Sequence, residues 1–293
     1  MKWFFGGVIV TMVCTSCEKS VEFELDQIEP KLVVDASIEN GVAPIVVLTK
    51  SLNYFSQISV QDLAGSFVQG AQVTISNGDS SQTLKEFTQP LPGGLSYRYY
   101  TVDTAAGQRF VGKLATRYNL SIVTEGKTYT ATTLIPNITR TIDSMWWRSV
   151  PGDTSGKEAA VIIRGADREG FGDYVRYWTK RNQEPFLPGL NSVFDDLIVD
   201  GSTYELQVEP GVDRNQTDLE EDDWGFRRGD TVTLKLANID KATFDFWRTM
   251  EFTYSSVGNP FSTPIKVTSN INGGALGYFG GYAAQFRTLV IPR

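Results

Sequence analysis

The side chains able to do chemistry in this sequence are mainly carboxylates, hydroxyls and lysines, because its 293 residues include no histidine and only two cysteines. The missing imidazole excludes Ser-His-Asp and Cys-His catalysis and every zinc or iron site that needs a histidine ligand. Catalysis would have to use paired carboxylates, a Lys or Tyr, a Ser-Lys pair, or a metal ion held by oxygen ligands alone.

Two pairs of acids could serve glycoside hydrolysis, which needs two carboxyl groups about 5 to 10 Å apart. They are Asp167 with Glu169, and Asp195 with Asp196. Any acidic chain offers such pairs, and the separation that matters is spatial. We therefore predict a protein that is not an enzyme and assign no catalytic residue.

The acidic segment 213–223 could hold calcium through oxygen ligands, with Asp213, Asn215 and Asp218 as weak candidates. It lacks the glycine that permits the sharp turn of the known calcium loop, and its spacing is irregular. The alternative is a solvated acidic loop, because runs of like charge usually face water. No cofactor is predicted.

The first residues have the pattern of a secretory signal. A basic start precedes an apolar run at 3–13, and the small residues Thr15 and Ser16 lead into Cys17. The apolar run is too short to span a bilayer, which needs about 20 residues. We predict a lipoprotein signal peptide at 1–16, cleavage before Cys17 and lipidation of that thiol. Cleavage would also remove Cys14, so the mature chain would have no disulfide.

An acidic tether is predicted at 17–29, directly after the modified cysteine. The whole chain carries a net charge of −7, which argues against nucleic acid as a partner because no basic stripe could offset phosphate charge. The aromatic fraction of 12% is sufficient for packed cores. The length suits two domains.

Residues 30–137 are predicted to form an immunoglobulin-like β-sandwich. Short runs of alternating or branched residues are separated by Gly and Asn turns, and Asn40-Gly41 favours a hairpin between the first two. Pro136 closes this unit, because proline cannot continue a central strand. The predicted strands are 31–38, 44–50, 71–76, 95–102, 118–124 and 127–133.

Residues 138–293 are predicted to form a second β-rich domain with one inserted helix near 241–255, so the fold class is mainly all-β. Asn238 or Asp240 can cap that helix. A glycine-rich loop is expected at 270–282, where glycines permit positive φ values and close backbone approach. A last strand is expected at 285–291.

Four aromatic residues are candidates for partner binding, because aromatic anchors dominate protein interfaces. They are Tyr278, Phe279 and Tyr282 in the glycine-rich loop, and Trp224. Core packing is the alternative, because aromatic side chains contribute so much burial.

Several landmarks together resemble a known family. They are the acidic segment after Cys17 and the segments 29–34, 125–131, 246–249, 258–262 and 274–283. In type and order they are similar to a Bacteroidota outer-membrane lipoprotein family of unknown function, typically encoded beside TonB-dependent receptors. The resemblance implies an immunoglobulin-like N-terminal domain, a second β-rich domain and an outer-membrane location. That family has no assigned catalytic residues, so none is carried over.

We therefore expect a lipid-anchored outer-membrane lipoprotein exposed at the cell surface. It would act as a non-enzymatic accessory or substrate-binding subunit of a β-barrel complex, with a TonB-dependent transporter as the partner. Two alternatives stay open at this point. One is a subunit of an outer-membrane protein assembly or secretion machine; the other is a surface glycan-binding protein or a carboxylate-dependent hydrolase.

Overall fold

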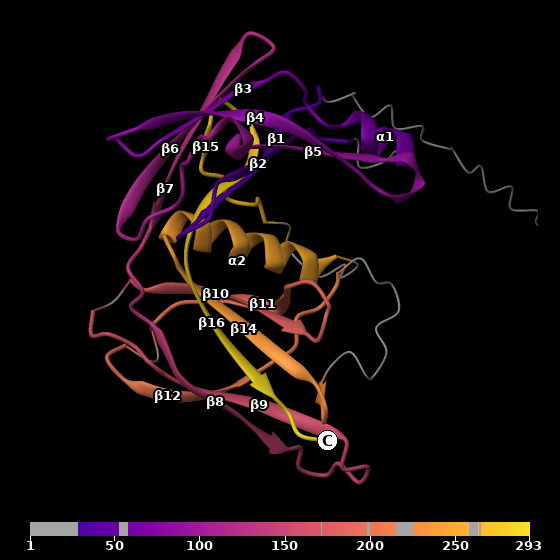
Figure 1. Cartoon of the computed structure of the whole chain (residues 1–293), viewed down its shortest axis with the longest axis vertical. Helices are drawn as coiled ribbons and strands as arrows, with labels where there is room; N and C mark the ends of the chain where they lie inside the picture. Colours follow the sequence, from indigo (N-terminus) through magenta and orange to yellow (C-terminus); the bar gives the residue numbers. More distant parts are fainter. Residues whose placement is uncertain are drawn as a thin grey trace, which may run out of the picture.

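The structure, a computed structural model, describes residues 29–52, 58–170, 172–197, 200–214, 225–257, 263 and 265–293. The chain is mainly β, as predicted from the sequence (Figure 1). Its first half contains β1 (Leu32–Glu39), β2 (Ile45–Lys50), α1 (Val60–Gly65), β3 (Gln72–Ser76), β4 (Ser81–Pro90), η1 (Pro92–Gly94), β5 (Ser96–Thr101), η2 (Thr104–Ala106), β6 (Thr116–Thr124) and β7 (Lys127–Ile135).

Within its described residues, the second half adds nine strands and the long helix that the sequence predicts. Asp240 caps this helix by accepting a hydrogen bond from the Thr243 N–H at 2.8 Å. The elements are β8 (Thr141–Ser149), β9 (Glu158–Ala166), β10 (Tyr174–Arg181), β11 (Leu187–Phe194), β12 (Thr203–Val208), β13 (Phe226–Arg227), β14 (Thr231–Ile239), α2 (Lys241–Ser256), β15 (Ile271–Asn272) and β16 (Leu276–Val290). No helix within the described ranges is long and apolar enough to cross a bilayer.

Two sheets are formed. The larger has the strand order β11-β10-β14-β16-β1-β2-β5-β4-β3-β6-β7-β15 and so includes strands from both halves of the chain. The smaller is built around β9, which pairs with β8, β12 and β13. Alternation along the strands explains the packing: in β1, Leu32, Val34, Ala36 and Ile38 are buried while the residues between them are more exposed.

The strand β16 connects the two halves. It pairs in parallel with β1 and antiparallel with β14, and it runs from the N-terminal strands down to the second sheet (Figure 1). Phe279 and Ala283 of β16 belong to the N-terminal core, whereas Tyr278 and Tyr282 pack in the core beneath α2. Residues 30–137 therefore share their core with residues near the other end of the sequence.

The prediction of a glycine-rich loop at 270–282 is wrong for most of its length, because residues 276–290 form one long strand. The expected positive φ values are present at Gly273, Gly274 and Gly277. At Gly277 the backbone also approaches closely, since a Cβ there would lie 1.9 Å from the carbonyl oxygen of Val34. The glycines therefore allow β16 to lie against β1 and do not create a loop.

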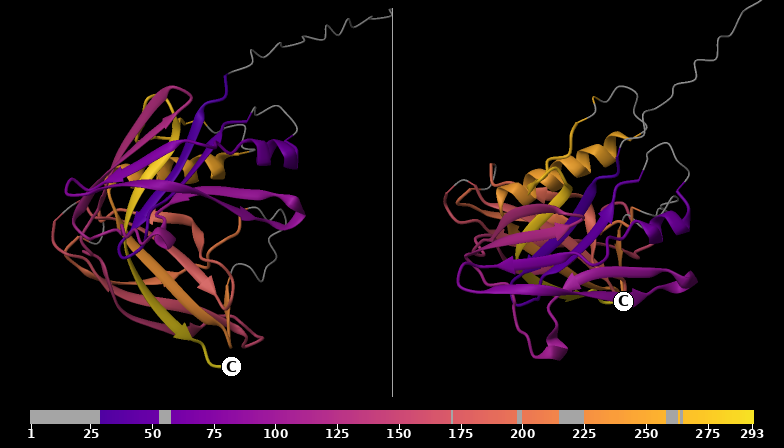
Figure 2. Two further views of the ribbon diagram at one scale, coloured as in Figure 1. Left: turned by 45° about the horizontal axis from the view of Figure 1, so that its top comes forward. Right: turned by 90° about the horizontal axis from the view of Figure 1, so that it is seen from above.

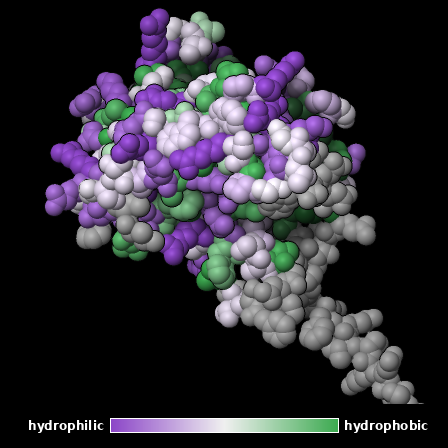
Figure 3. All heavy atoms as spheres, turned by 90° about the horizontal axis from the view of Figure 1, so that it is seen from below, coloured by the Kyte–Doolittle hydropathy of each residue, from purple (hydrophilic) through white to green (hydrophobic). Residues whose placement is uncertain are grey.

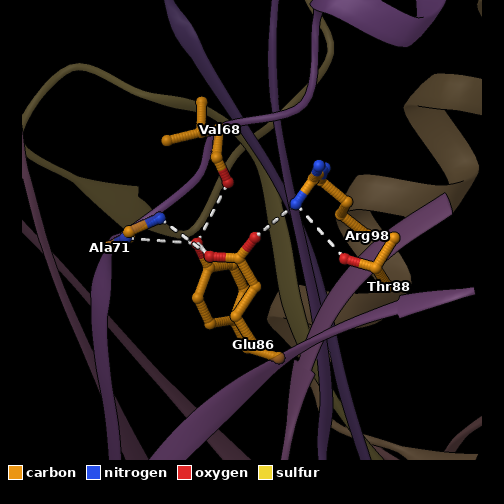
Figure 4. A network of polar contacts seen from close by, with 7 residues as sticks. Val68, Ala71, Glu86, Thr88 and Arg98 are labelled. Carbon is orange, nitrogen blue, oxygen red and sulfur yellow. Dashed lines mark hydrogen bonds and ion pairs between the residues drawn. The ribbon is translucent and has the colours of Figure 1, made fainter. Parts of the chain in front are cut away.

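The hairpin of β4 and β5 projects together with α1 beyond the other N-terminal strands (Figure 2). A polar network ties the segment after α1 to this hairpin (Figure 4). The Glu86 carboxylate accepts hydrogen bonds from the Gly70 N–H at 2.8 Å and from Arg98 Nη1 at 3.0 Å. The Tyr100 hydroxyl lies 3.2 Å from Glu86 and 3.0 Å from the Val68 carbonyl oxygen.

Glu86→Gln is expected to destabilise the protein by about 1–2 kcal/mol near pH 7, because it weakens hydrogen bonds to a charged group. Burial alone would raise the pKa of Glu86, but the hydrogen bonds from Gly70, Arg98 and Tyr100 and the charge of Arg98 lower it below 4.5. The stabilisation is therefore complete above pH 4.5 and is lost as the pH falls through the lowered pKa. Urea unfolding near pH 7 and below pH 4 measures this difference.

Glu205→Gln is the control, because its ion pair with Arg148 is exposed and spans 3.4 Å. Such pairs contribute about 0–1 kcal/mol. A Glu86→Gln protein as stable as the wild type near pH 7 would contradict the role of the network. So would a loss that is as large in acid as at neutral pH.

Candidate functional site

A cleft lies between β11 of the large sheet and β12 of the small sheet, next to α2. It has an inner part of about 300 Å³ and an outer part of about 690 Å³. The two parts are adjacent, because five residues line both of them: Arg140, Asn191, Phe194, Tyr204 and Leu206. Volumes of this size are typical of sites for small molecules or short chain segments.

The walls of the cleft are apolar and partly open to solvent. Phe194, Leu206 and Phe252 are each about half exposed, and Leu197 is 71% exposed. Single exposed apolar side chains are normal, but several around one concavity indicate a binding site. On the face seen in Figure 3, by contrast, hydrophobic residues form separate spots among hydrophilic ones.

Arg140 is the buried cation of this cleft. Its Nε donates to Asp167 Oδ1 at 3.2 Å, and its side chain is 4% exposed. Its Nη2 has no hydrogen-bond partner within the described part of the chain. A buried donor without a partner costs about 1–3 kcal/mol, and because this atom is shielded from solvent a molecule in the cleft would reach it only after the side chain moved.

Glu251 of α2 lies at the outer part of the cleft, but its carboxylate serves the fold. It accepts hydrogen bonds from the backbone N–H of Ser192 at 3.0 Å and from the Ser192 hydroxyl. Arg214 Nη2 lies 3.7 Å from the same carboxylate. These contacts fasten α2 to β11 and fix one wall of the cleft.

Tyr177 forms part of the inner wall and stacks with Phe194 at a centroid distance of 6.0 Å. Burial raises the pKa of the Tyr177 hydroxyl above its usual value, and the nearby charges of Glu209 and Glu251 raise it further. Tyr177 is therefore neutral at physiological pH and offers a ring face and no anionic oxygen.

Three of the four aromatic residues predicted to contact a partner, Tyr278, Phe279 and Tyr282, are in the core. Tyr278 and Tyr282 are less than a tenth exposed, and Phe279 is fully buried. Tyr278 stacks on Phe246 at 4.4 Å, and Trp247 Nε1 donates to the Tyr282 hydroxyl at 3.1 Å. The prediction that these three residues form a surface patch is therefore wrong. The alternative, that they pack in the core, is confirmed.

The other predicted site residues are mostly outside the described part of the chain. Cys17, Asn215, Asp218 and Trp224 all lie there, so the structure does not test their roles. Asp213 is described and half-buried, and it is not part of the group of acids with spacing suited to a metal ion.

The structure instead brings together one member of each predicted acid pair. Asp167 and Asp196 lie beside Asp200, with one carboxylate oxygen of each within 4.8 Å of the others. Asp195 points elsewhere and lies 3.5 Å from Arg248 Nη1. The separation of Asp167 and Asp196 along the chain hid this cluster from sequence reasoning.

The fold and the cleft define an all-β protein with a ligand-sized cavity between two sheets and one helix. Comparison with family models shows that the chain belongs to the family described as Domain of unknown function (DUF4249), whose model matches residues 18–287. No curated protein matches the chain.

Proposed function

We propose that this protein is a lipid-anchored outer-membrane lipoprotein that acts as a non-enzymatic accessory or substrate-binding subunit of a β-barrel complex. The expected partner is a TonB-dependent transporter. The cleft beside α2 is the observation that carries the binding role, because it combines open apolar walls with a buried arginine. The segment ending at Cys17 supports the anchor.

The chemistry of the cleft favours an apolar segment of the barrel partner as its occupant. Phe194, Leu206 and Phe252 would cover that segment, with each 100 Å² of apolar surface removed from water contributing about 2.5 kcal/mol before the cost of association.

Binding agrees better with the acids of the cleft than hydrolysis does. Of the acids that line the cleft, Glu251 is held by Ser192, and Asp195 lies 3.5 Å from Arg248 Nη1. A general acid or base needs to reach the reacting group directly or through one water. Tethering at the membrane would make weak binding sufficient, because anchoring raises the effective concentration of a partner in the same membrane.

Leu206→Glu tests the cleft. This residue is 51% exposed on β12, so the change is expected to leave stability within about 0.5 kcal/mol of the wild type. A charge on the apolar wall is expected to lower the affinity for the barrel partner at least tenfold, equivalent to about 1.4 kcal/mol. The measurement is the yield of the TonB-dependent barrel that co-purifies with the tagged protein in mild detergent.

The matched control is Leu63→Glu on α1, where the leucine is 49% exposed and outside the cleft. It is expected to recover as much barrel as the wild type. Equal recovery with both variants would remove the cleft from the proposal. Recovery of an assembly barrel in place of a TonB-dependent one would favour the alternative partner.

A further inference from the structure

Three aspartates converge where the loops after β9 and β11 meet. Asp167 directly follows β9, and Asp196 and Asp200 follow β11. Each offers one carboxylate oxygen, and these oxygens all lie within 4.8 Å of one another. Asp167 and Asp196 are buried, and Asp200 is half-buried.

The carboxylate of Asp167, a member of this cluster, has one unsatisfied oxygen. Its side chain is 0% exposed, and Oδ1 accepts from Arg140. Oδ2 is buried without a hydrogen-bond partner among the residues that the structure describes. Leaving a carboxylate oxygen buried and unpaired costs free energy, so contact of this atom with a cation or a hydrogen-bond donor would be favourable.

The charges around Asp167 also favour a bound cation. Asp173 and Asp196 are acids close to Asp167, and Arg140 is its ion-pair partner. One arginine therefore faces several acids. Taking the three clustered aspartates with Arg140 leaves a formal charge of −2, which a divalent cation would balance.

Backbone donors hold the other two aspartates in place. Asp196 Oδ2 accepts from the N–H groups of Gly172 at 2.7 Å and Asp173 at 3.0 Å. Asp200 Oδ1 accepts from the Gly170 N–H at 2.7 Å. These bonds fix each carboxylate through one oxygen, so the second oxygen of each can face a common ion.

We propose that Asp167, Asp196 and Asp200 form a calcium-binding site. Ca²⁺ binds oxygen ligands at about 2.3–2.6 Å, so two ligands of one ion can be separated by up to about 5 Å, which fits this cluster. Mg²⁺ demands shorter distances of about 2.0–2.1 Å and uses one or two carboxylates, which suits it less well. Water and backbone carbonyl oxygens would complete the coordination.

The site would also order one wall of the cleft. Asp195 and Leu197 flank Asp196 and line the outer cleft, and Arg140 joins Asp167 to both parts of it. Calcium binding is nevertheless independent of the proposed partner and can be measured on the isolated protein.

Calorimetric titration of the full chain, purified in mild detergent and freed of metal with a chelator, tests the site with CaCl₂ alone. We expect one site with a Kd of about 10⁻⁴–10⁻³ M, the range of extracellular calcium modules. Thermal unfolding at about 10 mM CaCl₂ is expected to shift upward by roughly 2–5 °C. The absence of both binding heat and a thermal shift in the wild-type protein would overturn the proposal. An equal or larger response to MgCl₂ would also overturn it.

Two substitutions locate the site. Asp200→Asn keeps the half-buried side chain close to its original size and is expected to weaken calcium binding at least tenfold and to halve the thermal shift or reduce it further. Asp195→Asn, in the same loop but outside the cluster, is expected to bind calcium like the wild type. Unfolding without calcium shows whether each variant is folded. Wild-type affinity in a folded Asp200→Asn protein would overturn the assignment.

Discussion

Cys17→Ser is expected to move the protein almost completely from the membrane fraction to the soluble fraction. Serine has no thiol to acylate, so the chain would lose every fatty chain that holds it. Burial of each CH₂ group contributes about 0.8 kcal/mol, and a single acyl chain binds only marginally while two or more anchor stably. Cell fractionation and immunoblotting would measure the change, with incorporation of a labelled fatty acid as a direct readout.

Cys14→Ser is the matched control, because Cys14 precedes the predicted cleavage site and would be removed with the signal. That variant is expected to stay in the membrane fraction and to incorporate label. A Cys17→Ser protein that still sediments with membranes would contradict lipid anchoring. Protease treatment of intact cells would then test exposure: degradation of the wild-type protein is expected if it faces outward.

The second large effect is expected from Gly277→Ala, which should lower the free energy of unfolding by several kcal/mol. The alanine Cβ would lie 1.9 Å from the carbonyl oxygen of Val34, in the parallel pairing of β16 with β1. Overpacking costs about 1–3 kcal/mol or more, and the positive φ of 95° adds about 1–2 kcal/mol for any residue with a Cβ. Urea unfolding gives the free energy.

Gly274→Ala separates the two contributions. Gly274 has a similar φ of 86°, but a Cβ there would meet nothing within 4 Å. It is expected to lose only about 1–2 kcal/mol from the backbone conformation. If the two variants unfolded at the same urea concentration, the close approach of β16 to β1 would not contribute to the loss of stability in Gly277→Ala.

Local patterns were enough to predict the fold class, several strands and the long helix. Alternation predicts strands such as β3 and β7, and of the two candidate caps, Asn238 and Asp240, it is Asp240 that caps α2. No local pattern indicates that Asp240 Oδ2 also accepts from the Leu134 N–H at 2.9 Å, which fastens α2 to β7. That bond depends on tertiary packing between residues distant in the sequence.

The segment 276–282 differs from the prediction because its composition matches a loop, whereas the strand expected at 285–291 is the second part of β16. Glycines weaken strand propensity, but in β16 neighbouring strands approach so closely that Gly277 cannot carry a side chain. Of the two interpretations of Tyr278, Phe279 and Tyr282, the surface patch depended on the loop, and strand pairing instead directs them into two cores. Burial of large aromatic rings therefore outweighed the local preference for a turn.

The cleft and the aspartate cluster could not be predicted from spacing. Both arise where loops and edges from distant parts of the sequence meet: Arg140 precedes β8, Asp167 follows β9 and Asp200 follows β11. Neither set has a fixed interval along the chain, so only the fold brings its members together.

The pairing of β1 with β16 also constrains the order of events during folding. Val33 lies opposite Leu276, so the N-terminal core cannot close until most of the polypeptide has been synthesised. Pairing of parallel strands that are so far apart in the sequence has a high contact order and is slow. Nascent molecules would therefore expose the unpaired edge of β1 for longer than a locally paired strand would, which favours binding of chaperones during synthesis.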